Sequence, residues 1–216
     1  MNRYQRGMMS AVFDWARVEN LQPEPVTVEI WQQLHEDFRQ LVEVTNGNII
    51  RTRESTRIHR EAVGRIADVI GIAVVADRHQ HNGYPLDVHT GCDIVLWAEP
   101  QATIRRPDAA LLSGPRHELL PLPAHQVKLV VEVVSDGISE VDALTKKTMY
   151  AMAGIPWYWI VWVTDTEVTS IEIYVLDHLL GQYRAHHQLR PGNLETVIEG
   201  LLRTRIDWDH LSGPDH

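Results

Sequence analysis

VKLVVEVVS, residues 127–135, is the stretch that decides the fold. A continuous run of β-branched and aliphatic residues predicts a β-strand that is covered on both faces. Glu132 stands alone in this run, and Asp108 stands in a second such run over residues 104–112. A buried carboxylate is unfavourable unless its charge is compensated, and a divalent cation between two acids compensates it well. The alternative, that both acids end their strands and face water or an arginine, is less consistent with the surrounding residues.

Size and composition are those of one soluble domain. The chain has 216 residues, of which 44% are hydrophobic and 23% are charged, and this suits a single core. We expect a leader over residues 1–24, which ends near Pro23 and Pro25, and one domain over residues 25–212. No apolar stretch reaches the roughly 20 residues that span a bilayer, and residues 1–17 do not form a secretory signal.

The single cysteine, Cys92, indicates a reducing compartment. One cysteine forms neither an internal disulfide nor a cysteine-rich zinc site. We therefore predict a cytoplasmic protein with no membrane partner, in which Cys92 is a small buried hydrophobic residue.

Acidic residues outnumber basic ones, but the basic ones are clustered. The formal net charge of -9 argues against a general nucleic-acid coat protein. A cluster of arginines in an acidic protein can bind phosphates weakly and with strong salt sensitivity. It can also be the solvated face of a helix, and the sequence leaves both interpretations open. The arginines concerned are Arg51, Arg53, Arg57, Arg60 and Arg65, with Arg105 and Arg106 directly before Pro107 and Asp108.

Hydrophobic periodicity and turn residues predict the elements of a mixed α/β domain. Asn46-Gly47, between two short apolar runs, predicts a β-hairpin. The order of elements indicates a central mixed sheet flanked by helices, with antiparallel strands toward the C-terminus. Helices are expected over residues 27–38 with Thr27 as N-cap, over residues 55–77 with Ser55 as N-cap, and from residue 139 or 142 to residue 153. Strands are expected over residues 85–89, 92–98, 104–113, 126–135, 157–163, 170–176, 182–187 and 194–198, and a closing turn over residues 208–211.

Three tryptophans lie in one strongly β-prone run, residues 157–163. Side chains alternate along a strand, so Trp157 and Trp159 share one face and Trp162 takes the other. At least one face is therefore expected to bury aromatic rings. Base stacking on these rings, or a homodimer contact if the strand is exposed near a sheet edge, stays open.

Two acids on neighbouring strands can bind one cation when both point to the same end of a sheet. Magnesium needs only a few carboxylates, because water and phosphate oxygens complete its shell, and it activates water for phosphodiester hydrolysis. A nearby lysine would stabilise the charge that develops on the phosphate. Lys146 is the candidate, because it shares one helical face with Asp142 and Tyr150. The alternative is a surface ion pair with Asp142.

Glu43 and His59 are further candidates. Glu43 is a third acid just before the Asn46-Gly47 turn, and His59 opens the long helix among the arginines. Glu43 could instead be a solvent-facing strand residue. His59 could instead be exposed or a capping partner.

A series of motifs in a fixed order resembles a known family. Over residues 28–212 the chain resembles the Uma-type restriction endonuclease family of the PD-(D/E)XK nuclease superfamily. The motifs are Glu132-Val133-Val134-Ser135, then Asp142, Lys146 and Tyr150, then Ala153-Gly154-Ile155-Pro156 and Tyr158-Trp159-Ile160-Val161, with Glu43-Val44-Thr45-Asn46-Gly47, His59 and Pro107-Asp108 upstream and Tyr174 and Gly181-Gln182-Tyr183 downstream.

The resemblance implies a restriction-endonuclease-like core, with Mg²⁺ or Mn²⁺ at one edge of the sheet. It makes Asp108 and Glu132 the metal ligands, Glu43 an accessory catalytic acid and Lys146 the catalytic lysine that stabilises charge. The implied activity is metal-dependent hydrolysis of DNA, from which RNA hydrolysis is not separable by sequence. Substrate contacts are expected from His59, Arg57, Arg60 and Tyr150.

The chain departs from the superfamily pattern in two places. The pattern has a lysine two residues after the second acid, where this chain has Val134. Lys146 would replace that lysine if its ammonium reaches the metal edge. In addition, Trp157 stands where glutamate is common, and Trp162-Val163-Thr164 replaces an acidic position. These departures leave a second hypothesis, a non-catalytic interaction or nucleic-acid-binding protein that keeps the nuclease core as a scaffold.

Overall fold

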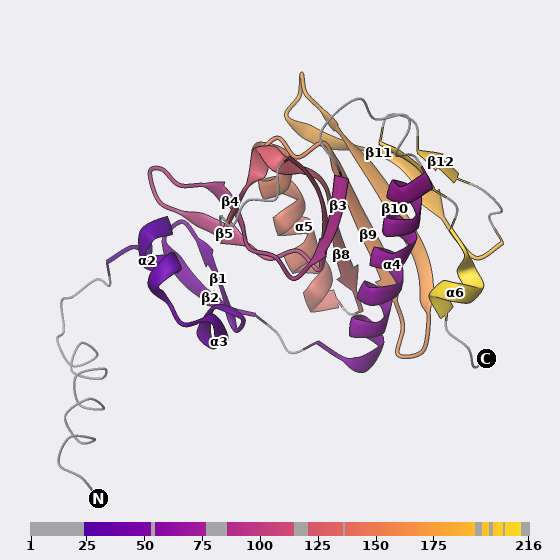
Figure 1. The fold of residues 1–216 in the computed structure, drawn as a ribbon, viewed down its shortest axis with the longest axis horizontal. Helices are drawn as coiled ribbons and strands as arrows, with labels where there is room; N and C mark the ends of the chain where they lie inside the picture. Colours follow the sequence, from indigo (N-terminus) through magenta and orange to yellow (C-terminus); the bar gives the residue numbers. More distant parts are fainter. Residues whose placement is uncertain are drawn as a thin grey trace, which may run out of the picture.

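A computed structural model describes residues 24–52, 55–76, 86–114, 121–135, 137–192, 196–198, 201–204 and 206–212 (Figure 1). Residues 1–23, nearly all of the expected leader, lie outside the described residues. The helices are α2 (Val28–Gln33), α3 (Glu36–Arg39), α4 (Arg57–Ala76), α5 (Gly137–Met152) and α6 (Trp208–Ser212), and a short 3-10 helix spans Ala124–Gln126. The strands are β1 (Val42–Thr45), β2 (Asn48–Arg51), β3 (Leu86–Thr90), β4 (Ile94–Trp97), β5 (Thr103–Arg105), β6 (Ala109–Ser113), β7 (Leu122–Pro123), β8 (Val127–Val134), β9 (Trp157–Val163), β10 (Val168–Asp177), β11 (Gln182–Leu189), β12 (Thr196–Ile198) and β13 (Leu202–Thr204).

The strands divide mainly between two mixed sheets. The larger has six strands in the order β11-β10-β9-β8-β6-β3, and the smaller has five in the order β2-β1-β5-β4-β7. Within the larger sheet β8 and β9 run parallel, as the intervening helix α5 requires, and the other pairs are antiparallel. The helices α4 and α5 cover its opposite faces (Figure 1). The predicted mixed α/β class is confirmed, although two sheets take the place of one central sheet.

The strand predicted over residues 104–113 is wrong as a single element. Its first part is β5 in the smaller sheet and its second part is β6 in the larger. Pro107 interrupts the run, because proline has no N–H to donate to a strand ladder. The break places Asp108 at the junction of the two sheets.

The predicted helices and the predicted hairpin are present, but several helices begin or end at other residues than predicted. The hairpin at Asn46-Gly47 is confirmed, with both residues at positive φ (47° and 74°), as a two-residue turn of this kind requires. Thr27 caps α2 by accepting the N–H of Ile30, but the helix predicted to Phe38 is broken into α2 and α3. Thr56 caps α4 in place of Ser55, since its hydroxyl accepts the His59 N–H at 3.3 Å. The sequence prediction missed β13, and the closing turn is the short helix α6.

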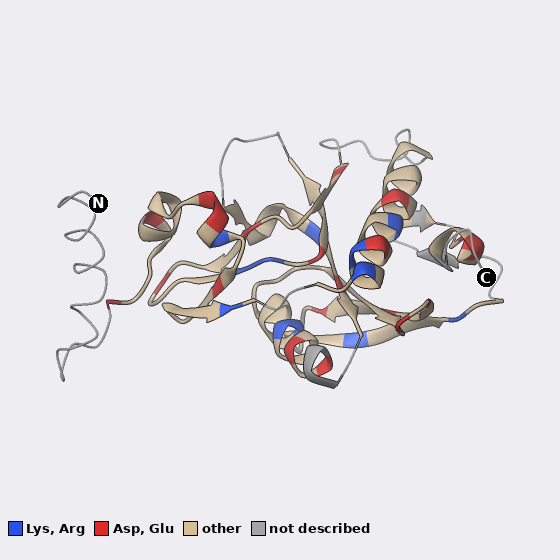
Figure 2. Ribbon diagram, turned by 90° about the horizontal axis from the view of Figure 1, so that it is seen from below, with Lys and Arg blue, Asp and Glu red and all other residues tan. Residues whose placement is uncertain are grey.

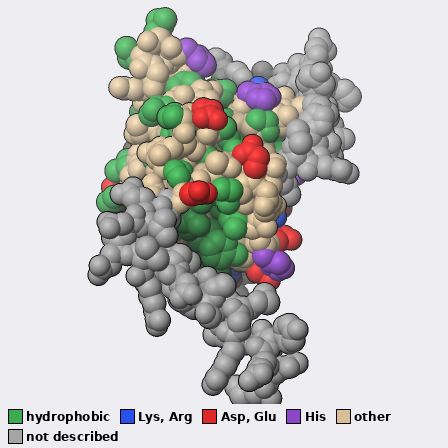
Figure 3. Space-filling model, turned by 90° about the vertical axis from the view of Figure 1, so that its left-hand side faces the viewer, with side chains coloured by type: hydrophobic (Ala, Val, Ile, Leu, Met, Phe, Trp, Pro, Cys, Tyr) green, Lys and Arg blue, Asp and Glu red, His purple; other side chains and the backbone are tan. Residues whose placement is uncertain are grey.

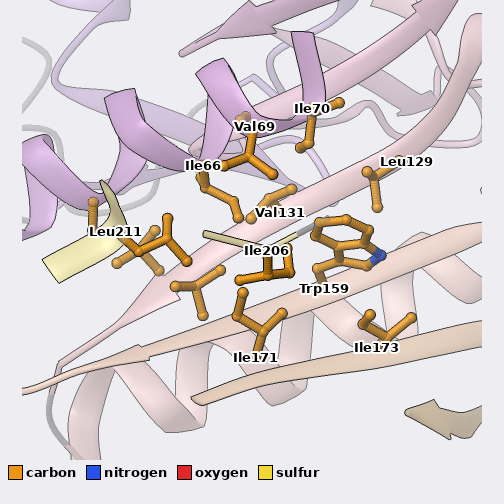
Figure 4. Packing of buried hydrophobic residues seen from close by; sticks show 14 of the residues in the cluster. Ile66, Val69, Ile70, Leu129, Val131, Trp159, Ile171, Ile173, Ile206 and Leu211 are labelled. Atoms are coloured by element: carbon orange, nitrogen blue, oxygen red, sulfur yellow. The ribbon is translucent and has the colours of Figure 1, made fainter. Parts of the chain in front are cut away.

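The core is apolar on the α4 face of the larger sheet. Ile66 and Ile70 of α4 pack there on Leu129, Val131 and Trp159 (Figure 4). Trp157 belongs to the same cluster and Trp162 packs on the other face, so the predicted alternation is confirmed. Trp157 and Trp159 are 7% and 0% exposed, which removes them as base-stacking surfaces. Their strand, β9, lies between β10 and β8 and is not an edge.

The remaining features are the single cysteine, the exposed hydrophobic side chains and the character of the helices. Cys92 is half-buried, and burial raises the pKa of its thiol to about 12. Hydrophobic side chains are exposed on the end of the molecule that carries the smaller sheet (Figure 3). Leu41, Ile49 and Ile50, in or next to strands of that sheet, are 55%, 46% and 41% exposed. No helix among the described residues is long and apolar enough to span a bilayer.

Candidate active site

Asp108 and Glu132 lie opposite each other on neighbouring strands. The pairing of β6 with β8 matches Ala110 with Val130 and Ala109 with Val131, and one further step of this register places Asp108 opposite Glu132. Oδ2 of Asp108 also accepts the backbone N–H of Val133 at 2.7 Å, which ties the two strands together. Both acids line one cavity of about 760 Å³.

Glu132 is a buried carboxyl with two partners from α5. Tyr150 donates its hydroxyl to Oε1 at 2.8 Å, and the Lys146 ammonium lies 3.3 Å from Oε2. Burial raises the pKa of Glu132 to about 8 although the charge of Lys146 acts to lower it, and the charges of Asp108 and Glu43 add to the rise. A carboxyl in such surroundings gains more from a bound cation than one in water does.

Lys146 reaches this site from α5. Its ammonium lies 3.2 Å from Glu43 Oε1, 3.3 Å from Glu132 Oε2 and 3.5 Å from Asp142 Oδ2. Burial acts to lower its pKa, but the surrounding carboxylates outweigh burial and raise the pKa above its usual value. The side chain is therefore a cation. Because Val134 occupies the superfamily's lysine position, Lys146 can replace that lysine only if its ammonium reaches the acids, and it does. Val134 itself is buried.

Glu43 is held by cations on both oxygens. Arg105 Nη1 lies 2.8 Å from Oε2, while Oε1 accepts the backbone N–H of Arg106 at 2.8 Å and faces Lys146. Burial acts to raise the pKa of Glu43, but the charges of Lys146 and Arg105 outweigh it and hold the pKa below its usual value. At 5% exposure Glu43 is no solvent-facing strand residue. Glu43 therefore connects the smaller sheet, through Arg105, to α5, through Lys146.

His59 is the neighbour of Asp108 from α4. Its Nε2 lies 3.2 Å from Asp108 Oδ2, the oxygen that also accepts from Val133. Burial acts to lower the pKa of His59, but the hydrogen bond and charge of Asp108 outweigh it and raise the pKa. The imidazole is thus neither an exposed side chain nor a helix cap, and it orients Asp108.

The other expected substrate contacts lie in different surroundings. Arg60 lines the cavity and donates to the backbone carbonyl of Ser55. Arg57 is exposed and pairs with Glu61, and it is not among the residues that line the cavity. Tyr150 is 0% exposed, so its hydroxyl bonds Glu132 and is out of reach of a substrate in the cavity.

Sequence reasoning missed Asp93, and it placed Arg105 in a phosphate-binding cluster without finding its contact with Glu43. Arg105 is 2% exposed and binds Glu43, and Asp93 is 7% exposed and binds Arg106. Their only sequence sign is a charge inside or next to an apolar run, the same sign that singled out Glu132. Figure 2 shows acidic and basic residues interspersed across the middle of the molecule, where the two sheets and α5 meet.

The acidic side chains of the cavity fit Mg²⁺ or Mn²⁺ better than they fit Zn²⁺. Across the described parts of the chain, no three or more His, Cys, Asp or Glu side chains are grouped to hold a metal. Zinc sites take three or four such ligands, so zinc does not fit. Mg²⁺ and Mn²⁺ accept two carboxylates and complete their shell with water and phosphate oxygens. The pair Asp108 and Glu132 fits that demand.

Comparison with known proteins agrees with this architecture. The model of a family described as "Putative restriction endonuclease", Uma2, matches residues 28–207. No curated protein matches the chain. A crystal structure of a protein from Anabaena variabilis, described as a putative nuclease, superposes with a TM-score of 0.59 and 16% sequence identity, over 80% of this chain and 89% of that chain. This likeness shows the fold.

Proposed function

The chain belongs to the Uma2 family, whose model is described as "Putative restriction endonuclease", and on that premise we propose that it is a Mg²⁺- or Mn²⁺-dependent endonuclease that hydrolyses phosphodiester bonds in DNA. One observation carries the proposal. Two acids from paired strands, Asp108 and Glu132, line one cavity, and Lys146 contacts the second of them. In metal-dependent phosphodiester hydrolysis, an acid pair holds the cation and a nearby fixed positive charge stabilises the charge that develops on the phosphate.

Each residue has a distinct role in this proposal. Asp108 and Glu132 would hold a divalent cation, which supplies Lewis-acid polarisation of the phosphate and a more acidic water. Lys146 stabilises the negative charge that develops on the phosphate oxygens. His59 and the Val133 N–H fix Asp108, and Tyr150 fixes Glu132. Glu43 holds Lys146 in place.

The acidic net charge is compatible with a nucleic-acid substrate because charges at the cavity are mixed. Arg51, Arg60 and Arg106 line it together with the acids. A bound divalent cation would offset the acids further. The same chemistry would cleave RNA, and DNA is the substrate we propose on the basis of the family.

The test combines cleavage with metal binding. Wild-type protein should nick plasmid DNA with Mg²⁺ or Mn²⁺ and not with EDTA. Asp108→Asn and Glu132→Gln should abolish both cleavage and the heat of metal binding in calorimetry, while circular dichroism shows the fold intact. Asp165→Asn, an exposed acid in a turn outside the cavity, is the matched control and should behave as wild type. Full cleavage by both site variants would dispose of the proposal.

A non-catalytic scaffold is the second candidate. It is favoured by Val134 at the superfamily's lysine position and by the net charge of -9. In a scaffold Lys146 would serve as the permanent counter-ion of Glu43 and Glu132. Absence of heat at millimolar Mg²⁺ and Mn²⁺ would support this candidate over the enzyme.

Two further expectations belong to the proposal. A cytoplasmic location follows from the single cysteine, which suits a reducing compartment.

A homodimer would cover the apolar end of the molecule seen in Figure 3. Sedimentation of the wild type against Leu41→Asp tests it, and a monomer at high micromolar concentration would contradict it.

A further inference from the structure

Asp93 and Arg106 form an ion pair at the edge of the cavity, and none of the roles above uses it. Nε and Nη2 of Arg106 lie 2.8 and 2.6 Å from the same oxygen, Oδ1 of Asp93. The other oxygen, Oδ2, accepts the indole N–H of Trp31 at 3.2 Å. Trp31 is 0% exposed in the core of the smaller sheet. The carboxylate is therefore fixed on both oxygens, and it fixes the guanidinium in turn.

The backbone of Arg106 is fixed as well. Its N–H donates to Glu43 Oε1 at 2.8 Å. Two residues on, the carbonyl of Asp108 accepts the N–H of Gly91 at 3.2 Å. Both Arg106 and Asp108 line the cavity. Arg106 is therefore a rigid cation beside the proposed metal site.

The other cations that line the cavity are placed differently. Lys146 is surrounded by Glu43, Glu132 and Asp142. Arg60 bonds a backbone carbonyl, and Arg51 lies exposed at the end of the edge strand β2. Arg106 uses its Nε side for Asp93, so the pair does not engage Nη1. A planar guanidinium held on one side by a carboxylate offers a fixed fork to a phosphate.

We propose that Arg106, oriented by Asp93, binds a backbone phosphate of the nucleic-acid substrate next to the phosphate at the metal site. The inference rests on the proposed function and deepens it. Contacts of this kind position a strand and carry no sequence information. Asp93 is a positioning residue in this arrangement, because it acts only through Arg106.

The test measures binding of a fluorescent DNA duplex by anisotropy, with Ca²⁺ as the metal, over a series of salt concentrations. Arg106→Gln should weaken binding about tenfold or more, since a hydrogen-bonded charge contact is lost. Its slope of log K against log salt should become less negative by about 0.9, the contribution of one phosphate contact. Arg184→Gln, an exposed arginine on β11 outside the cavity, is the matched control and should match wild type.

Two more variants separate charge from orientation. Arg106→Lys keeps the charge and should keep the slope, but it should lose affinity because the fork is gone. Asp93→Asn should also keep the slope and weaken binding, and it should add nothing in the double variant with Arg106→Gln. If Arg106→Gln does not fold, Arg106→Lys decides, and wild-type affinity in that variant overturns the contact.

The outcomes separate this inference from the proposed function. If wild type binds and cleaves DNA but Arg106→Gln shows wild-type affinity and slope, the phosphate contact is overturned and the nuclease stands. If wild type neither binds nor cleaves, the proposed function fails and this inference fails with it. A tenfold loss with a reduced slope, absent from the control, supports the contact.

Discussion

The two faces of the larger sheet differ in what strand β8 buries on them: apolar side chains on the α4 face and a carboxyl group on the α5 face. On the α4 face, β8 contributes Val131 and Val133 to an apolar cluster with the helix. On the α5 face the same strand contributes Glu132, which is 6% exposed. That carboxyl is tolerated because α5 brings Lys146 and Tyr150 to it. Burial of a charge is possible where the covering helix carries its partners.

The difference determines how each face should respond to change. On the α4 face the residues interact through packing, so a truncation costs stability in proportion to the cavity that it leaves. On the α5 face the groups are mutually dependent, so loss of one leaves another charge buried and unpaired. A change there should affect both stability and the proposed chemistry.

The largest effect is expected for Lys146→Met. The substitution leaves Glu43 and Glu132 without their shared cation, which should lower the free energy of unfolding by roughly 3–5 kcal/mol and abolish cleavage. Urea denaturation and a plasmid-nicking assay measure the two. The neighbouring Lys147, whose ammonium lies over the Tyr174 ring, is the matched control. Lys147→Met should cost only about 0.5–1 kcal/mol, and equal losses in the two variants would contradict the account.

Leu129→Ala probes the α4 face. Leu129 is fully buried in the apolar cluster, and its truncation should cost about 2–5 kcal/mol. Cleavage per folded molecule and metal affinity should not change, as calorimetry and nuclease assays below the unfolding transition would show. A loss of metal affinity as large as the effect of Lys146→Met would break the distinction between the faces.

Two buried acids should give pH dependences of opposite sign. The pKa of Glu43 is held below its ordinary value of 4.5, so its contribution to stability is complete above about 4.5 and lost as pH falls through the lowered pKa. The pKa of Glu132 is raised from 4.5 to about 8, so the folded state loses stability as pH rises between these values.

Urea titrations of Glu43→Gln and Glu132→Gln from acid to pH about 8 measure these signs. The stability of wild type relative to Glu43→Gln should grow as pH rises toward 4.5. Relative to Glu132→Gln it should fall as pH rises toward 8. Parallel curves for the two variants would show that one acid is misassigned.

The smallest effect is expected for Tyr150→Phe. It removes one hydrogen bond to Glu132 and keeps the ring, so stability should fall by about 1–2 kcal/mol. Metal affinity should fall by about tenfold, as is usual when a group that orients a ligand is lost. Tyr183→Phe, whose hydroxyl bonds the Ile155 carbonyl, is the control and should leave metal affinity unchanged. Wild-type affinity in Tyr150→Phe would remove that role.

The sequence predicted most of the strands and both long helices because their signals are local. The Asn46-Gly47 hairpin, the periodicity of α4 and the apolar runs of β8 and β9 each depend on neighbouring residues. The division of residues 104–113 between two sheets does not depend on neighbouring residues alone. It depends on which strands each half pairs with, and some of those strands lie far away in the sequence. The presence of Pro107 inside the run was the available sign of that break.

The candidate site was predictable to the extent that lone charges stand out in apolar runs. Glu132 and Asp108 were found in this way, whereas Lys146 was found from the helical face that it shares with Asp142 and Tyr150. The structure brings Glu132, Asp108 and Lys146 to one cavity. The roles of Tyr150 and His59 were not predictable, since spacing along a helix does not say whether a hydroxyl or an imidazole points to a substrate or to a carboxylate. Asp93 was missed because its partners, Trp31 and Arg106, come from separate parts of the chain.

Whether Asp108 and Glu132 together bind a divalent cation can be seen by anomalous diffraction from crystals soaked in Mn²⁺. We expect one strong peak in the cavity, within about 2.0–2.3 Å of a carboxylate oxygen of Asp108 and of Glu132, and no such peak in crystals of Glu132→Gln. A cavity without a peak at saturating Mn²⁺, with Lys146 still between Glu43 and Glu132, would contradict this expectation.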